Sequence, residues 1–139
     1  MRRNLGPAEL GDLLELPLVA VLATYRENGG VLLSPVWHRW HDGAFEVAIG
    51  PKDVKLRHLR RDPRASIVVY EHQPPYRGLE ARGEARLVSE SASEALRSMA
   101  VRYLGPEDGP AYAESAGDGV LVRLEPDELR GWDFADEMG

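Results

Sequence analysis

Short runs in which apolar and polar residues alternate dominate this chain, a pattern typical of half-buried β-strands. Six such runs occupy 19–24, 31–40, 44–49, 65–71, 79–88 and 120–124. In the run 79–88, Leu79, Ala81 and Leu87 share one face, and charged residues fill the other. Gly83 lies in the middle of this run, which suits a strongly curved strand better than a flat one. We therefore expect a curved sheet.

Two stretches with helical spacing interrupt the strands. The first follows the third strand, with Asp53 as its expected cap, and ends before Pro63, which disfavours helix at the preceding residue. The second begins near Ser91, where Ser91 and Glu94 match a capping box, and ends at Gly105-Pro106. Its expected apolar face comprises Leu96, Met99, Ala100, Tyr103 and Leu104.

Six closely spaced strands and two helices predict a mainly β fold, a closed or split β-barrel. The chain of 139 residues has 43% hydrophobic residues, which fits one domain that removes roughly two-thirds of its unfolded surface from water. No repeat or linker divides the sequence. We expect a single domain over 1–139, with 1–14 and 126–139 as flanking segments.

Composition excludes several classes of function. The chain has no cysteine, which excludes disulfides, thiolate metal sites and a cysteine nucleophile, and no metal-binding residues are predicted. The net charge of −6 argues against nonspecific nucleic-acid binding. The longest uncharged stretch, 16–25, is about half the length of a membrane span, and no apolar signal follows Arg2 and Arg3. We expect a cytoplasmic protein whose redox chemistry, if any, comes from a bound cofactor.

One segment departs strongly from the acidic average. Residues 51–64 hold six Lys or Arg against two Asp, a local charge of +4, while the remaining chain carries −10. Lys55 falls in the first turn of the predicted helix, where free N–H groups and the helix dipole already favour an anion. A phosphate group is a natural ligand there. The alternative is a solvated basic face, with Leu56 and Leu59 packed inward.

The second predicted strand carries large apolar residues on both faces. One face comprises Val31, Leu33, Pro35 and Trp37, and the other Leu32, Ser34, Val36, His38 and Trp40. Both faces need covering, by a partner subunit or a planar ligand, or alternatively by the chain's own helices. Pro35 cannot donate to a sheet ladder, so it marks an edge strand or a bulge where a ligand can approach the backbone.

Five motifs occur in order along the chain: PVW at 35–37, DG at 42–43, KxRxLRRDPR at 55–64, PPY at 74–76 and ExRGxA at 80–85. Together they resemble the pyridoxamine 5'-phosphate oxidase-like superfamily, and within it the branch of F420-dependent oxidoreductases. The resemblance implies a six-stranded split β-barrel of the FMN-binding type with Greek-key order. It also implies a homodimer with two cofactor sites at its interface.

The resemblance assigns binding roles by position. Lys55 would hold the cofactor phosphate, with Arg57 or Arg60 in support. The residues that would line the ring are Ser34, Pro35, Val36 and Trp37. Those that would follow the ribityl-like chain and phosphate are Ala48, Ile49, Gly50, Pro51 and Lys52. Tyr76 and Trp132 would come from the other subunit.

The basic segment favours F420 over FMN, because F420 continues beyond its phosphate into an oligoglutamate tail that needs more cations. The reaction would be hydride transfer from reduced F420 to a planar conjugated small molecule, with His38, His41 and Tyr76 as candidate proton donors. Three alternatives stay open. They are an FMN-binding protein, a protein that binds F420 or FMN without turnover, and a haem-binding protein.

Overall fold

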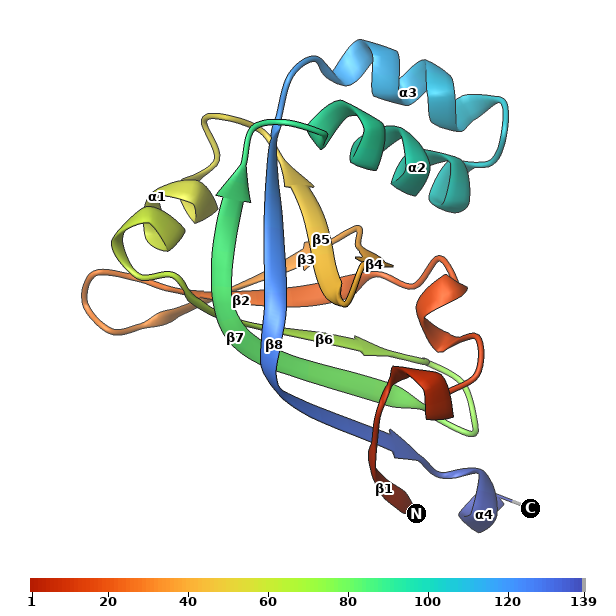
Figure 1. Cartoon of the computed structure of the whole chain (residues 1–139). Helices are drawn as coiled ribbons and strands as arrows, with labels where there is room; N and C mark the ends of the chain where they lie inside the picture. Colours follow the sequence, from red (N-terminus) through yellow and green to blue (C-terminus); the bar gives the residue numbers. More distant parts are fainter. Residues whose placement is uncertain (139) are drawn as a thin grey trace.

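The computed structural model describes residues 1–138, and within that range the chain forms one eight-stranded antiparallel sheet (Figure 1). The strand order is β3-β2-β6-β7-β8-β5-β4, and β1 pairs with β8. The strands are β1 (Arg2–Leu5), β2 (Ala20–Tyr25), β3 (Val31–Val36), β4 (Arg39–His41), β5 (Ala44–Ile49), β6 (Arg64–Tyr70), β7 (Gly78–Val88) and β8 (Val120–Asp133). The helices are α1 (Val54–Arg61), α2 (Ala92–Leu104), α3 (Asp108–Ala116) and α4 (Ala135–Met138), with 3-10 turns at Pro7–Glu9 and Leu13–Glu15.

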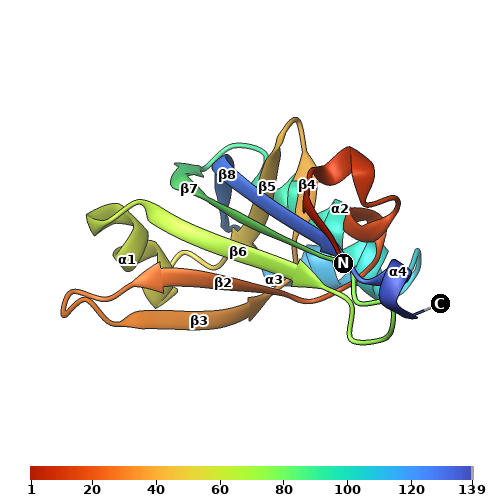
Figure 2. The same ribbon diagram turned by 90° about the horizontal axis from the view of Figure 1, so that it is seen from below.

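Strands β7 and β8 give the sheet its curvature. They pair along the full length of β7, and a β-bulge interrupts the pairing between Arg82 and Gly83. A Cβ atom on Gly83 would collide with the carbonyl oxygen of Glu125, so glycine permits the close approach of the two backbones at the bend. Both views show the sheet curling into an open half-barrel (Figures 1 and 2). The curvature predicted from the mid-strand glycine is confirmed.

The order of the strands is that of a Greek key. β5 lies beside β8, whereas the next strand along the chain, β6, lies between β2 and β7. The mainly β, split-barrel fold predicted from the sequence is therefore confirmed, but the described residues form eight strands and four α-helices where six and two were predicted.

Two strands differ from their predicted bounds by more than one residue at an end. The run 31–40 divides into β3 and β4 because residues 37 and 38 leave the strand, and the alternation changes phase across the break. Arg39 is consequently buried and donates to Glu46 at 2.6 Å. The last strand extends to Asp133, and β1 pairs with its end, so both predicted flanking segments contribute to the sheet. The charged sequence of 125–130 hides this extension from a pattern search.

The hydrophobic core fills the concave side of the sheet. Its fully buried members from the strands include Leu22, Phe45, Ile67, Leu79 and Val122. Its members from segments that close the half-barrel are Leu10, Leu13, Leu56 and Leu59. Burial of each large apolar side chain stabilises the fold by about 1.5–3 kcal/mol.

Helix α1 forms as the sequence predicts. Asp53 is its N-cap, and Asp53 Oδ1 accepts a hydrogen bond from the backbone N–H of Lys55 at 2.9 Å. The helix ends at Arg61, before Asp62 and Pro63, because proline disfavours helix in the residue that precedes it. Leu56 and Leu59 anchor the helix in the core, so the basic residues face other directions.

The region after α2 differs from the prediction. Gly105 ends α2, but the chain then forms a further helix, α3, which packs against α2. Gly109 makes the close contact possible, since a Cβ atom there would lie 2.6 Å from the Cα of Val101. The predicted capping box is wrong, because the side chain of Ser91 makes no cap hydrogen bond and Glu94 instead accepts two bonds from Arg39. No helix in residues 1–138 is long and apolar enough to span a membrane.

Candidate cofactor-binding site

A cavity of about 270 Å³ lies where the two ends of the curled sheet approach each other. The predicted site residues that line it are Pro35, Val36, Trp37, Ala48, Ile49, Gly50 and Lys55. β3 and β5 are far apart in the strand order, so only the curl of the sheet brings their ends to one cavity. β3 is an edge strand, as Pro35 indicates, because a proline there leaves no ladder hydrogen bond unmade.

The start of α1 supplies the charged groups of the cavity. Lys55 Nζ lies 2.9 Å from Asp53 Oδ2, and both side chains line the cavity wall. Burial raises the pKa of Asp53, but the hydrogen bonds and charge of Lys55 outweigh it and hold that pKa below its usual range. A cation is thus held at the cavity by a carboxylate that also caps the helix. An incoming phosphate would share Lys55 with Asp53.

Trp37 provides a fixed aromatic wall. Its ring stacks on Tyr103 with centroids 4.9 Å apart and an interplanar angle of 6°. The Tyr103 hydroxyl donates to the carbonyl of Leu18 at 2.6 Å and accepts from the backbone N–H of His38 at 3.2 Å. The hydrogen bonds hold Tyr103, and Tyr103 in turn holds the Trp37 ring.

The α2–α3 pair adds cavity residues that the predicted site did not include. They are Leu96, Met99 and Tyr112. Leu96 and Met99 belong to the apolar face predicted for α2, so the helical spacing of apolar residues in the sequence already indicated them. Tyr112 lies 5.2 Å from Trp37 between ring centroids and also lines an adjoining cavity of about 200 Å³. It was missed because Gly109 and Pro110 conceal α3 in the sequence.

Five predicted residues on or near the first two cavity strands and α1 lie elsewhere. Ser34 is buried within β3, while Pro51 and Lys52 are exposed just before the helix and do not line the cavity. Arg57 lines a different hollow, and Arg60 is exposed and does not line the cavity. Lys55 is therefore the basic residue of α1 that faces the cavity.

Tyr76 and Trp132 do not line the cavity of their own chain. Tyr76 lies in the hairpin between β6 and β7, and Trp132 packs its ring over Gly78 near the end of β8. In Figure 1 this hairpin and the α2–α3 pair lie at opposite ends of the molecule. Their predicted role needs a second copy of the chain.

The two histidine candidates do not line the cavity either. His38 is fully buried against Phe45 and Tyr103, and neither ring nitrogen has a hydrogen-bond partner within residues 1–138. Burial, with the charge of Arg102 in second place, lowers the pKa of His38 to about 3. His38 is thus a neutral core residue, and its geometry argues against a donor role. His41 is exposed beside Asp42, 3.2 Å away.

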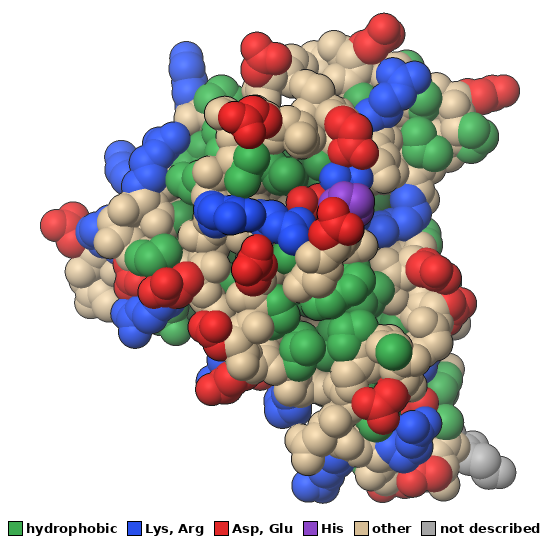
Figure 3. All heavy atoms as spheres, in the orientation of Figure 1, with side chains coloured by type: hydrophobic (Ala, Val, Ile, Leu, Met, Phe, Trp, Pro, Cys, Tyr) green, Lys and Arg blue, Asp and Glu red, His purple; other side chains and the backbone are tan. Residues whose placement is uncertain are grey.

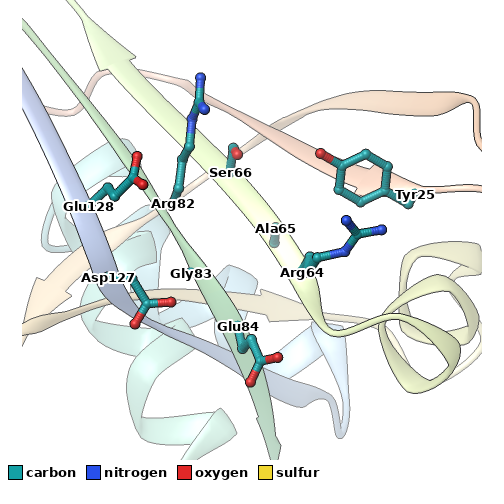
Figure 4. Close-up of a pocket in the computed structure, with 9 residues that line it drawn as sticks. All are labelled: Tyr25, Arg64, Ala65, Ser66, Arg82, Gly83, Glu84, Asp127 and Glu128. Atoms are coloured by element: carbon teal, nitrogen blue, oxygen red, sulfur yellow. The ribbon is translucent and has the colours of Figure 1, made fainter.

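A further hollow of about 330 Å³ crosses β6, β7 and β8 (Figure 4). The residues labelled there include Tyr25, Arg64, Arg82, Glu84, Asp127 and Glu128. Arg64 stacks over the Tyr25 ring at 4.8 Å, and its guanidinium also pairs with Asp62 at 2.8 Å. Charges of both signs line this hollow, and it contains none of the residues predicted to bind the cofactor.

Comparison with known proteins identifies the family. The family model for pyridoxamine 5'-phosphate oxidase matches residues 7–133. No curated protein matches the chain.

Solved structures agree with the family match. A conserved hypothetical protein from Mycobacterium tuberculosis has a TM-score of 0.79 at 27% identity, over 97% of this chain and 89% of its own. An F420 reductase has a TM-score of 0.69 at 27% identity, over 85% and 93%. The haem storage protein HutZ from Vibrio cholerae, at 20% identity and a TM-score of 0.68 over 88% and 92%, shares the fold. The chain therefore belongs to the pyridoxamine 5'-phosphate oxidase family.

Proposed function

We propose that this protein is an F420-dependent reductase that transfers a hydride from reduced F420 to a planar conjugated small molecule. The observation that carries the proposal is the cavity in which Lys55, at the capped start of α1, faces an apolar wall that ends in Trp37. The similarity of 27% to an F420 reductase over 85% of the chain supports the choice of cofactor.

The residues of the cavity fit such a cofactor. Lys55 and the N-terminal turn of α1 would hold the phosphate. A Cβ atom placed on Gly50 would meet nothing within 4 Å, so the glycine leaves open space in which a ribityl-like chain can approach the backbone. Pro35, Val36 and Trp37 would lie against the ring.

The protein's share of the reaction is positioning. When bound, F420 supplies the hydride, and this chain's residues orient its ring and exclude water around it. Leu96, Met99 and Tyr112 extend the apolar wall from the α2–α3 pair. These side chains would give a flat, conjugated substrate apolar and aromatic contacts.

FMN is the second candidate, and one observation favours it. Only Lys55 among the basic residues of 52–61 lines the cavity, and one cation matches a single terminal phosphate.

F420 would instead use the remaining basic residues, because its acidic tail would bind them outside the cavity. These residues are Lys52, Arg57, Arg60 and Arg61.

We also propose that the working form is a homodimer. Val31 and Leu33 on β3 are 48% and 65% exposed, an apolar edge that a second copy would cover. The partner would bring its Tyr76 and Trp132 to the cofactor.

Paired titrations test the choice of cofactor. F420 and FMN are titrated into the protein at low and at physiological ionic strength, with quenching of cofactor fluorescence as the signal. We expect F420 to bind more tightly, and its affinity to fall more steeply with salt, because exposed charge pairs of the tail are screened. If FMN binds at least as tightly as F420 at low salt, the proposed cofactor is FMN and not F420.

Turnover is tested separately. Reduced F420 is mixed with a quinone and the protein, and the reappearance of the visible absorbance of oxidised F420 is followed. We expect catalysed oxidation of the cofactor, which Lys55→Ala slows at subsaturating F420. Tight F420 binding without turnover of quinones or enones would make the protein a carrier.

A further inference from the structure

Another hollow, of about 550 Å³, lies between α1 and the hairpin that joins β2 to β3. We call it the hairpin hollow. Three arginines line it, Arg26 from the hairpin and Arg57 and Arg61 from α1. In Figure 3 several basic side chains lie at the left of the view, where Figure 1 places α1 and the hairpin, with acidic side chains among them. Three arginines thus line one hollow in a chain whose net charge is −6.

None of the three arginines pairs with a carboxylate in the part of the chain that the structure describes. Carboxylates are plentiful, since the sequence has 23 Asp and Glu against 17 Lys and Arg. Glu27 is the carboxylate in the lining, so the three arginines and this glutamate give a local charge of +2. The hollow therefore offers guanidinium charges that no carboxylate of the described residues neutralises through an ion pair.

Hydrogen bonds fix the walls of the hairpin hollow. Arg61 Nη2 donates to the carbonyl of Tyr25 at 2.6 Å, which ties α1 to the hairpin. The turn is closed by the N–H of Arg26, which donates to the carbonyl of Gly30 at 2.7 Å. Asn28 Oδ1 accepts from Gly30 N at 2.9 Å, so its carbonyl oxygen is already used. Val54, 38% exposed, adds an apolar contact surface.

The positive charges of the three arginines all act on the ring of His58. This ring is buried and forms a hydrogen bond between its Nδ1 and Thr24 Oγ1 at 3.0 Å. Burial lowers the pKa of His58, and the charges of Arg61, Arg26 and Arg57 lower it further, while Asp53 opposes them. The same three guanidinium groups that line the hollow thus act together at one point.

The hairpin hollow is separate from the cofactor cavity. Val54, Arg57 and Arg61 recur at spacings of three and four residues and share one face of α1. Lys55 lies on another face and lines the cofactor cavity. One short helix therefore presents cations to two different spaces.

We propose that the hairpin hollow is a second anion-binding site, for a flexible ligand that carries several carboxylate or phosphate groups. Each arginine can donate to one anionic group, and a volume of about 550 Å³ has room for several such groups on one ligand. The ligand can arrive as a free polyanion or as the acidic tail of the cofactor bound on the other face of α1. The second source rests on the proposed function.

The first experiment needs no cofactor. Sodium tripolyphosphate and a synthetic tetraglutamate peptide are titrated calorimetrically into the full-length protein at low ionic strength. We expect binding that weakens about fivefold in Arg57→Gln and in Arg26→Gln, the scale of one partly exposed charge pair. The matched control is Arg97→Gln on α2, which removes the same charge from an exposed arginine that lines neither hollow. Absence of binding, or equal loss in Arg97→Gln, would overturn the proposal.

The second experiment separates the two sources. Affinity is measured for F420 preparations with short and long glutamate tails. If the tail occupies the hollow, affinity rises with tail length in the natural protein and not in Arg57→Gln. If the ligand is a free polyanion, tail length has no effect while tripolyphosphate binding keeps its dependence on Arg57. A protein that binds tripolyphosphate through Arg57 but no F420 would contradict the proposed function and support the second site.

Discussion

At the scale of single residues, Lys55 and Lys52 make a matched pair. Lys55 lines the cavity and pairs with Asp53, whereas Lys52 is exposed before the helix. We expect Lys55→Ala to weaken binding of a phosphate-bearing cofactor about tenfold or more, because it removes a charge-assisted bond in a partly buried setting. Lys52→Ala should change it by less than about threefold. Fluorescence titration measures both, and equal losses would show that Lys55 does not hold the phosphate.

The buried ring of His38 makes the stability of the protein depend on pH. Its pKa is lowered to about 3 in the folded protein, while an unfolded chain has the ordinary value near 6.5. Below that value the unfolded state binds the proton more readily, so stability falls as the pH drops from 6.5 toward 3. Between pH 7 and pH 5 the loss from His38 should be about 2 kcal/mol.

Urea denaturation at the two pH values measures this loss. His38→Phe removes the titrating ring and should flatten the pH dependence of the free energy of unfolding. His58, whose pKa is also lowered, is present in both proteins. If natural protein and His38→Phe lose the same stability between pH 7 and pH 5, His38 is not neutral in the fold.

At the scale of elements, the bend of β7 and β8 depends on one glycine. Gly83→Ala would place a Cβ atom against the carbonyl oxygen of Glu125, and relief of that collision requires the two backbones to move apart. We expect a loss of about 1–3 kcal/mol in the free energy of unfolding. Gly50→Ala is the control, since its Cβ meets nothing within 4 Å. Similar stabilities of the two variants would contradict the role given to Gly83.

Elements with a local signal were predictable, and those without one were not. α1 has a capping Asp53 at its start and Pro63 after its end, and both act on neighbouring residues. α3 has no comparable signal. Glu107 at its start makes no side-chain cap, and Gly109 is a residue type that disfavours helix. Gly109 is favourable only because α2 lies against it, a contact that the local pattern does not contain.

At the scale of the whole molecule, the exposed apolar edge on β3 predicts association. Light scattering after size exclusion should give about twice 15.4 kDa at micromolar concentration. Leu33→Glu should shift the protein toward the monomer, because it places a charge on a residue that is 65% exposed in the single chain. Leu104→Glu, at an exposed site on α2, should leave the mass unchanged. If the natural protein is monomeric, no partner can bring its Tyr76 and Trp132 to the cofactor, and the role proposed for these residues is wrong.

Elements whose causes are local could be predicted from the order of the residues. Alternation of period two located the core of six strands, Asp53 marked the start of α1, and Gly83 marked the bend, because each effect acts within a few residues or across one ladder. Tertiary structure decided which residues share a space. Curling of the sheet brought the ends of β3 and β5 together, packing of α3 on α2 carried Tyr112 to the cavity, and the docking of α1 separated Lys55 from Arg57 and Arg61. Such contacts join residues far apart in the chain, so no local pattern contains them.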